Sequence, residues 1–167
     1  MTECLSKSEL LDWIDLLYTD LSKDNLYIGG YYFTFDHLVD FFILQQDLEA
    51  YKSSIKDKIN TLSKKNKKSP SKDAQAAIVK LSKDLQEIKI ELHCKDKFGN
   101  KKVVPCTPDE FKVVFDTLLE FKKDIEYFKE YCQEEAEKVE TKEIGSFMWF
   151  LNDMVEDMRE RFRGEIS

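Results

Sequence analysis

The sequence predicts a mainly α protein: an antiparallel bundle of two long helices plus shorter helices, with a small β-hairpin. Only five glycines and three prolines interrupt 167 residues, so long helices meet few breaks. Apolar residues recur at spacings of three and four over most of the chain, which is the period of an amphipathic helix. Because 42% of the residues are hydrophobic, we expect one packed core and a single helical domain over residues 1–167.

The first helix is expected over residues 7–22. Ser6-Lys7-Ser8-Glu9 has the pattern of a capping box, in which Ser6 and Glu9 bond each other's backbone N–H groups. Downstream, two aromatic runs that favour β-structure flank Gly29-Gly30. This arrangement predicts a short hairpin or tight reversal over residues 26–33.

The first long helix is predicted over residues 36–64, with Thr34 or Asp36 as its cap. The lysine-rich residues 64–72 are predicted to form a loop, because their charges repel one another and Pro70 cannot continue the helix. A shorter helix is expected over residues 71–87. Three heptads of the long helix keep three-or-four spacing, at Phe41, Leu44, Leu48, Tyr51, Ile55, Ile59 and Leu62.

Residues 88–105 are predicted to form the β-hairpin. Apolar residues alternate strictly over 88–94, which favours a strand, although Ile88 and Leu92 also fit a helix. The turn-forming residues 96–100 and a second short β-favouring run decide for two paired strands.

The second long helix is predicted over residues 108–140. Thr107 stands at the N-cap and Pro108 at the first helical position, and acids follow in the first turn. Leu118 and Phe121 lie on its apolar stripe and are predicted core positions. A last helix is expected over residues 146–163, capped by Ser146 and ended by Gly164.

Charge is separated into three blocks along the chain. Residues 1–50 carry a net charge of −8, residues 51–106 carry +9, and residues 107–167 carry −8. Acidic ends around a lysine-only basic middle indicate a chain that presents electric fields to partners. No run approaches the ~18 apolar residues of a membrane span, and the N-terminus lacks the pattern of a signal peptide. We therefore expect a cytoplasmic protein without a membrane partner.

The leading interpretation is a non-enzymatic protein-binding module, an adaptor or a small inhibitor of a larger complex. Tyr27, Tyr31, Tyr32 and Phe33 surround the Gly-Gly turn, and such rings are typical of binding anchors. The alternative is that these rings pack back on the core. A protein partner is expected, and the oligomeric state is left open.

One concrete version is an inhibitor of a nucleic-acid-handling complex, because acidic helices can occupy a basic groove. The chain is rich in lysine, aspartate and phenylalanine and poor in arginine and glycine. This bias is typical of AT-rich genomes, and it favours a phage- or virus-encoded protein.

A first alternative is nucleic-acid binding through the lysine-rich residues 51–106. No arginine occurs before Arg159, and arginine is the residue suited to bidentate recognition of phosphates and bases. The expected binding is therefore weak and nonspecific. The candidate contacts are Lys64, Lys65, Lys67, Lys68 and Lys72.

A second alternative is a Mg²⁺-dependent enzyme that uses carboxylates of the C-terminal helices. The arrangement resembles helical nucleotide pyrophosphatases, which hold Mg²⁺ with carboxylates of two adjacent helices. The last helix lacks that family's Glu-x-x-Asp, and solvated outer faces of amphipathic helices have the same composition. The carboxylates are Glu134, Glu135, Glu137, Asp153, Glu156, Asp157 and Glu160.

The remaining chemistry of the sequence indicates no enzyme and no cofactor. Neither histidine stands beside a serine or cysteine in a catalytic pattern, and the glycines never form a phosphate-binding loop. His93, Cys94 and Cys106 offer three metal ligands at most. The four cysteines include no C-x-x-C pair and are expected to be free, buried thiols.

Overall fold

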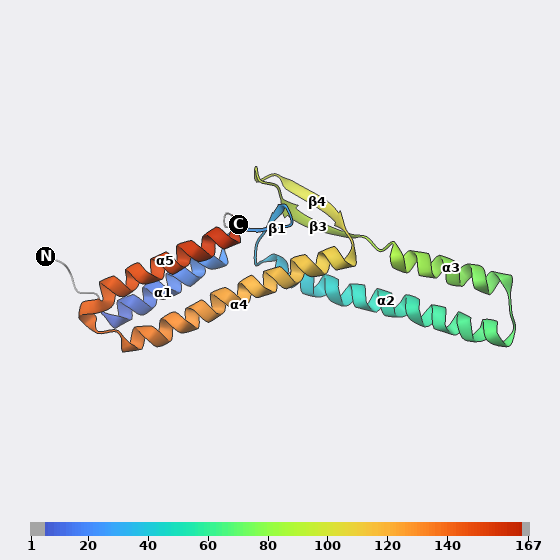
Figure 1. Cartoon of the computed structure of the whole chain (residues 1–167), viewed down its shortest axis with the longest axis horizontal. Helices are drawn as coiled ribbons and strands as arrows, with labels where there is room; N and C mark the ends of the chain where they lie inside the picture. The colour runs from blue at the N-terminus through green and yellow to red at the C-terminus, as the bar shows by residue number, and fades with distance from the viewer. Residues whose placement is uncertain (1–5, 165–167) are drawn as a thin grey trace. The chain divides into compact units, whose positions relative to one another are not determined.

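The computed structural model describes residues 6–164, and this part of the chain is mainly helical with a small antiparallel sheet (Figure 1). The predicted fold class is confirmed. The described residues form five α-helices, one short 3-10 helix and four strands: α1 (Lys7–Ser22), β1 (Leu26–Ile28), β2 (Tyr31–Phe33), α2 (His37–Lys68), α3 (Lys72–Gln86), β3 (Ile90–Lys95), β4 (Lys101–Cys106), α4 (Pro108–Lys138), η1 (Thr141–Glu143) and α5 (Ile144–Phe162).

Contacts within the described chain cluster into two compact units. The first unit comprises residues 6–38, 94–101 and 114–164, and the second comprises residues 39–93 and 102–113. A single domain over the whole chain stays a prediction, and each unit is described by itself below.

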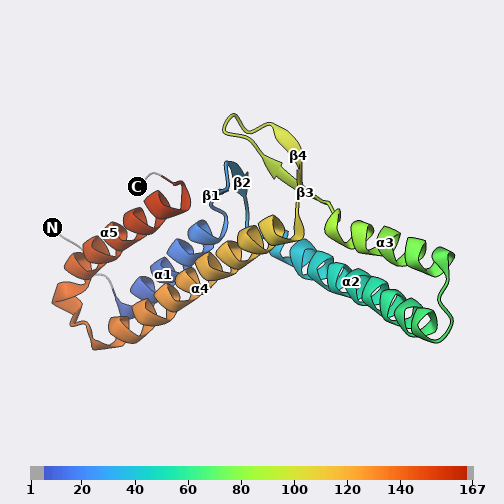
Figure 2. The same ribbon diagram turned by 45° about the vertical axis from the view of Figure 1, so that its right-hand side comes forward.

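In the first unit, α1, α5 and most of α4 lie side by side (Figures 1 and 2). Leu10 and Ile14 of α1 are buried, and so is Leu151 of α5. Leu118 of α4 is fully buried, as predicted. Phe121 is only half-buried, with its ring 4.9 Å from the ring of Phe162, so the prediction of a full core position was wrong for it.

Caps define the helix starts where the sequence has the required side chains. The Ser6–Glu9 capping box of α1 is present. At α4, the Thr107 hydroxyl accepts from the Glu110 N–H at 3.2 Å, and a Glu110 carboxylate oxygen accepts from the Thr107 N–H at 3.1 Å. The predicted cap Ser146 was wrong: α5 begins at Ile144, because the 3-10 turn η1 leads directly into it.

The four strands form one antiparallel sheet in the order β1-β2-β3-β4. Both predicted hairpins are present, β1–β2 around Gly29-Gly30 and β3–β4 over residues 90–106, one residue beyond the predicted end. Along β3 buried and exposed residues alternate, which confirms the predicted strand. The turn after β3 is held by Asp96, whose carboxylate accepts from the N–H groups of Phe98 and Asn100, both at 2.9 Å.

In the second unit, α2 and α3 form a helical hairpin (Figures 1 and 2). The loop predicted over residues 64–72 was wrong in its first part, because α2 continues to Lys68. Lysine has good helix propensity, and cations in the last turn interact favourably with the negative end of the helix dipole. The helix stops before Ser69, which precedes Pro70 and is therefore disfavoured in the helical conformation. Ser71 then caps α3.

Three described cysteines, Cys94, Cys106 and Cys132, are free and buried, as predicted. Burial raises the pKa of the Cys94 and Cys106 thiols, and it raises the pKa of Cys132 to about 12. The fourth cysteine, Cys4, lies outside the described residues.

Candidate interaction surfaces

The aromatic hairpin β1–β2 is built on two glycines with positive φ. Gly29 has φ +61° and Gly30 has φ +94°, the conformation that a two-residue hairpin turn needs. The register pairs Leu26 with Phe33, Tyr27 with Tyr32 and Ile28 with Tyr31. Leu26, Ile28 and Phe33 are buried. The register therefore places Tyr31 on the face of the hairpin that carries these buried residues, and it places Tyr27 and Tyr32 together on the opposite face.

The four predicted partner-binding residues divide into two groups. Phe33 is 2% exposed and its ring lies edge-on to His37, so it supports the fold from inside. Tyr27 is 40% exposed, with its ring centroid 5.2 Å from that of Tyr32. Tyr31 and Tyr32 are half-buried. Three tyrosines thus reach the surface, and their role as a partner's anchor stays a prediction.

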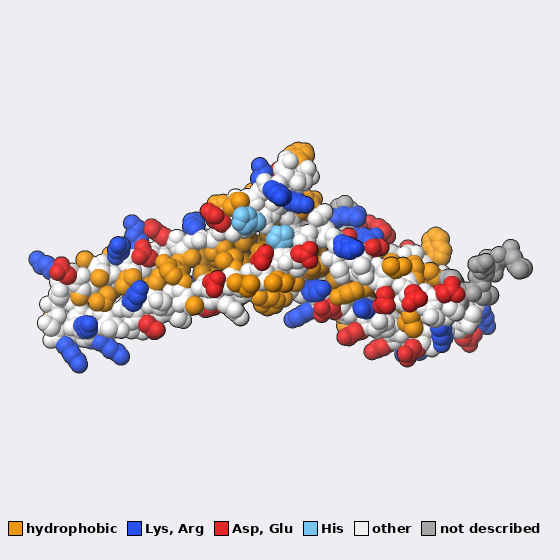
Figure 3. Space-filling model, turned by 180° about the vertical axis from the view of Figure 1, so that it is seen from behind, with side chains coloured by type: hydrophobic (Ala, Val, Ile, Leu, Met, Phe, Trp, Pro, Cys, Tyr) orange, Lys and Arg blue, Asp and Glu red, His pale blue; other side chains and the backbone are white. Residues whose placement is uncertain are grey.

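The predicted lysine cluster lies where α2 turns into α3. All five side chains are exposed, and none forms an ion pair with another described residue. Residues 52–72 contain eight lysines and one acid, Asp57. Figure 3 shows lysine side chains at this end of the second unit. The cluster is Lys64, Lys65, Lys67, Lys68 and Lys72, called the lysine tip below.

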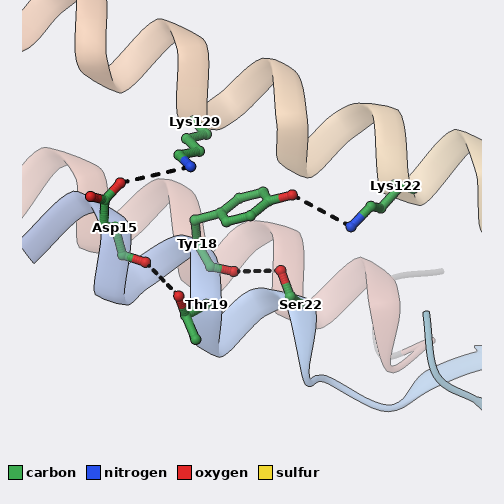
Figure 4. A network of polar contacts seen from close by, with 6 residues as sticks. All are labelled: Asp15, Tyr18, Thr19, Ser22, Lys122 and Lys129. Atoms are coloured by element: carbon green, nitrogen blue, oxygen red, sulfur yellow. Dashed lines mark hydrogen bonds and ion pairs between the residues drawn. The ribbon is translucent and has the colours of Figure 1, made fainter. Parts of the chain in front are cut away.

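Tyr18 of α1 lies between two lysines of α4 (Figure 4). The Lys129 ammonium is 4.6 Å from the centre of the Tyr18 ring and 3.8 Å from the Asp15 carboxylate. The Lys122 ammonium is 5.7 Å from the ring centre and donates to the Tyr18 hydroxyl at 3.4 Å. Cation–π contacts of this kind hold α1 to α4. Both lysines are therefore used inside the first unit.

A cavity of about 390 Å³ lies beside Tyr18, and hydroxyl groups line much of it. The Thr19 hydroxyl donates to the Asp15 carbonyl at 2.9 Å, and the Ser22 hydroxyl donates to the Tyr18 carbonyl at 2.8 Å. Both bonds join residues of α1, and in each of them the hydroxyl donates to a backbone carbonyl and not to a basic side chain. Thr34 also lines the cavity, and its hydroxyl lies 3.2 Å from Nδ1 of His37.

The outer face of α5 carries two aromatic rings that the sequence analysis did not single out. Trp149 is 75% exposed and Phe150 is 50% exposed. The core side of the helix is already formed by Ile144, Leu151 and Val155, which are buried. The sequence contains a signal for this exposed face. Phe147 to Phe150 are four consecutive large apolar residues, and in a helix four neighbouring side chains cannot all face one core.

A row of carboxylates continues this face from Trp149. Helical spacing places the residues four, seven, eight and eleven positions later on the same side as Trp149. Arg159 bonds Asp24 at 3.3 Å and also lies 3.7 Å from Glu156 of this row, whereas Arg161 lies 3.8 Å from Asp124. The row is Asp153, Glu156, Asp157 and Glu160, and together with Trp149 and Phe150 it is called the α5 outer face.

The described residues offer no geometry for the metal sites considered from the sequence. Nowhere in residues 6–164 do three or more His, Cys, Asp or Glu side chains come together in a way that could hold a metal ion. Glu156 instead lies 3.7 Å from Arg159. His93 is exposed while its neighbour Cys94 is buried, so the two side chains leave β3 on opposite faces.

Charge differs between the two units. Within the described residues, the first unit contains 21 acidic and 13 basic residues, and the second contains 10 acidic and 13 basic residues. No described helix contains a stretch that is both long and apolar enough to cross a bilayer. No protein-family model, curated protein or solved structure matches the chain.

Proposed function

We propose that this chain is a non-enzymatic protein-binding module whose α5 outer face docks on a partner with a basic surface and an apolar pocket. The observation that carries the proposal is Trp149, a 75% exposed ring beside the half-exposed Phe150 on a helix whose core side is complete. Tryptophan is one of the residues enriched among binding hot spots, which lie in well-packed pockets of the interface.

The carboxylate row supports the chemistry of this partner. Asp153, Asp157 and Glu160 form no ion pair with another described residue. Unpaired acids around an aromatic anchor attract a basic surface, speed its approach and disfavour acidic partners. An adaptor or inhibitor that occupies the basic groove of a nucleic-acid-handling complex has this character. A cytoplasmic, phage- or virus-encoded inhibitor is the concrete form that we propose.

The experiment compares capture by matched variants. The tagged full chain is incubated with nuclease-treated lysate of its source cells, in parallel with Trp149→Ala/Phe150→Ala and with Tyr127→Ala. Tyr127 is 73% exposed on α4 and serves as the control for loss of an exposed ring. A protein lost with the α5 variant, retained by the control and released by salt is the expected result. Identical capture by all three chains contradicts the proposal.

Nucleic-acid binding through residues 51–106 is a second candidate, favoured by the exposed and unpaired lysine tip. Affinity for a generic duplex is then expected to fall steeply between low and physiological salt. Changing Lys64, Lys65, Lys67 and Lys68 to glutamine is expected to flatten that dependence. Absence of binding at low salt eliminates this candidate.

A further inference from the structure

Apolar residues of α2 and α3 face each other along this hairpin and form a seam. Beyond the base of the hairpin, no other described element of the second unit covers this seam. Ile55 of α2 is 4% exposed, but no residue from Lys56 to Lys89 is buried. The residues along the seam are half-buried at most, and α3 contains no buried residue although its apolar residues lie on one face. These seam residues are Ile59, Leu62, Ala74, Ala77, Ile78, Leu81 and Leu85.

A two-helix hairpin of this kind is an incomplete bundle. Helices in proteins are stabilised mainly by packing of an apolar face, and a pair of helices covers each seam from one side only. The seam of this hairpin therefore needs a further apolar layer. Figure 3 shows hydrophobic side chains along the second unit, with lysines at its end.

The base of the hairpin is the electrostatic opposite of its tip. A cavity of about 490 Å³ lies there, lined by apolar residues and by Asp47, Asp84 and Glu87. Lys89 also lines it, so the charged lining sums to −2. Glu87 is paired with Lys83 at 3.9 Å, whereas Asp47 and Asp84 form no ion pair with a described residue. The lysine tip lies about 20 residues along α2, which is roughly 30 Å at the rise of an α-helix.

We propose that this hairpin pairs with the hairpin of a second copy of the chain, in antiparallel orientation, and so completes a four-helix layer. Antiparallel pairing places the lysine tip of each copy on Asp47 and Asp84 of the other, with the two-fold axis near Ile55. Parallel pairing brings two lysine tips together, and like charges in contact are destabilising. The surface is self-complementary, as a two-fold symmetric dimer requires.

The test is a charge exchange read by molar mass. The tip variant carries Lys64→Glu, Lys65→Glu and Lys67→Glu, and the base variant carries Asp47→Lys and Asp84→Lys. Sedimentation of the full-length wild type at rising concentration is expected to approach twice the chain mass of 19.7 kDa. In each variant alone, tip and base carry charge of the same sign and repel each other. The dissociation constant of the dimer is therefore expected to rise about tenfold or more, so that each variant remains monomeric at concentrations where the wild type dimerises.

An equimolar mixture of the two variants is the decisive measurement. In a mixed antiparallel dimer, the acidic tip of one chain faces the basic base of the other, and the native tip faces the native base. Dimerisation is therefore expected to return in the mixture. A control chain with Lys97→Glu, Lys101→Glu and Lys123→Glu has the same change in net charge away from the hairpin, and it is expected to dimerise like the wild type. Far-ultraviolet circular dichroism verifies that all chains keep their helices.

Four results overturn the proposal. A wild type that is monomeric at every concentration up to hundreds of micromolar shows that the proposed interface does not form. A mixture that stays monomeric shows that tip and base do not meet. Stronger self-association of the tip variant alone indicates parallel pairing. Binding of duplex nucleic acid by a wild type that remains monomeric assigns the lysine tip to nucleic acid instead.

Discussion

The ring of Tyr27 lies directly against the backbone of Gly164. A Cβ atom on Gly164 would stand 2.7 Å from Cδ1 of this ring, and Gly164 has φ +74°. The Gly164 N–H also donates to the Arg161 carbonyl at 3.1 Å, which closes the last turn of α5. Only glycine satisfies both the positive φ and the close approach without moving the aromatic hairpin or the helix end.

Gly164→Ala is expected to lower the free energy of unfolding by about 1–3 kcal/mol, because it adds backbone strain and a clash with Tyr27. Gly145→Ala is the matched control. Gly145 lies within α5 with open space around its Cα, so this change is expected to raise stability by about 0.4–1 kcal/mol. Chemical denaturation measures both, and equal effects of the two substitutions contradict the assignment.

Tyr32→Ala is expected to lower stability by about 1 kcal/mol, since it removes the ring that packs on Tyr27. For a chain of this length, the expected fall in melting temperature is about 2–4 °C. The double variant Tyr31→Ala/Tyr32→Ala is expected to fall further. A melting temperature that does not move shows that the fold does not use these rings, and it favours their role as an anchor for a partner.

Arg159→Met is expected to destabilise the first unit more than Asp24→Asn does. Burial is the main cause that raises the pKa of Asp24, and the pKa stays raised although Arg159 and Arg163 act to lower it. Removal of Arg159 leaves a partly buried carboxylate without its partner, at a cost of about 1–3 kcal/mol. Asp24→Asn removes the charge that is costly to bury and is expected to be nearly neutral at pH 7.

The raised pKa of Asp24 determines how the stability of the folded chain changes with pH near this ion pair. Since the pKa of Asp24 is raised in the folded state, the folded chain binds the proton more tightly than the unfolded chain. Its contribution to stability is largest below the ordinary pKa of 3.8 and is lost as pH rises through the raised value. The penalty of Arg159→Met is therefore expected to shrink on acidification. A penalty that grows at low pH contradicts this balance.

Thr107→Ala is expected to cost about 1 kcal/mol through loss of the α4 cap. Bonds from the Thr107 backbone and side chain lower the pKa of Glu110, so the substitution is also expected to move that pKa up toward its ordinary value. Titration followed by NMR measures the shift. Thr61→Ala is the control, because the Thr61 hydroxyl bonds a carbonyl within α2 and caps nothing.

Local signals in the sequence were sufficient for most of the fold. The capping pair Ser6–Glu9, the turn Gly29-Gly30 and the start at Thr107-Pro108 each specify a conformation within a few residues, and the structure contains all three. The loop predicted at Lys64 was wrong because charge repulsion between solvated lysines is weak against helix propensity.

The surfaces were harder to predict, because they depend on which side of each element faces a neighbour. Trp149 lies outside the apolar stripe that predicts the core side of α5, and a single apolar stripe does not indicate a second apolar face on the same helix. Phe33 lies one position from Tyr32, yet one ring is buried and the other half-exposed. The half-covered seam along Leu81 depends on the absence of a further covering helix among the described residues of the second unit, and no local pattern in the sequence specifies that absence.

The reactivity of the three buried thiols reports on local unfolding of the chain. Cys94 and Cys132 belong to the first unit and Cys106 to the second. Since burial raises the pKa of these three thiols, their alkylation in the native chain is expected to be slow, and each of the three is expected to react mainly when its surroundings open. Mass spectrometry of peptides after timed alkylation therefore records, without any mutation, whether the two units unfold together or one before the other.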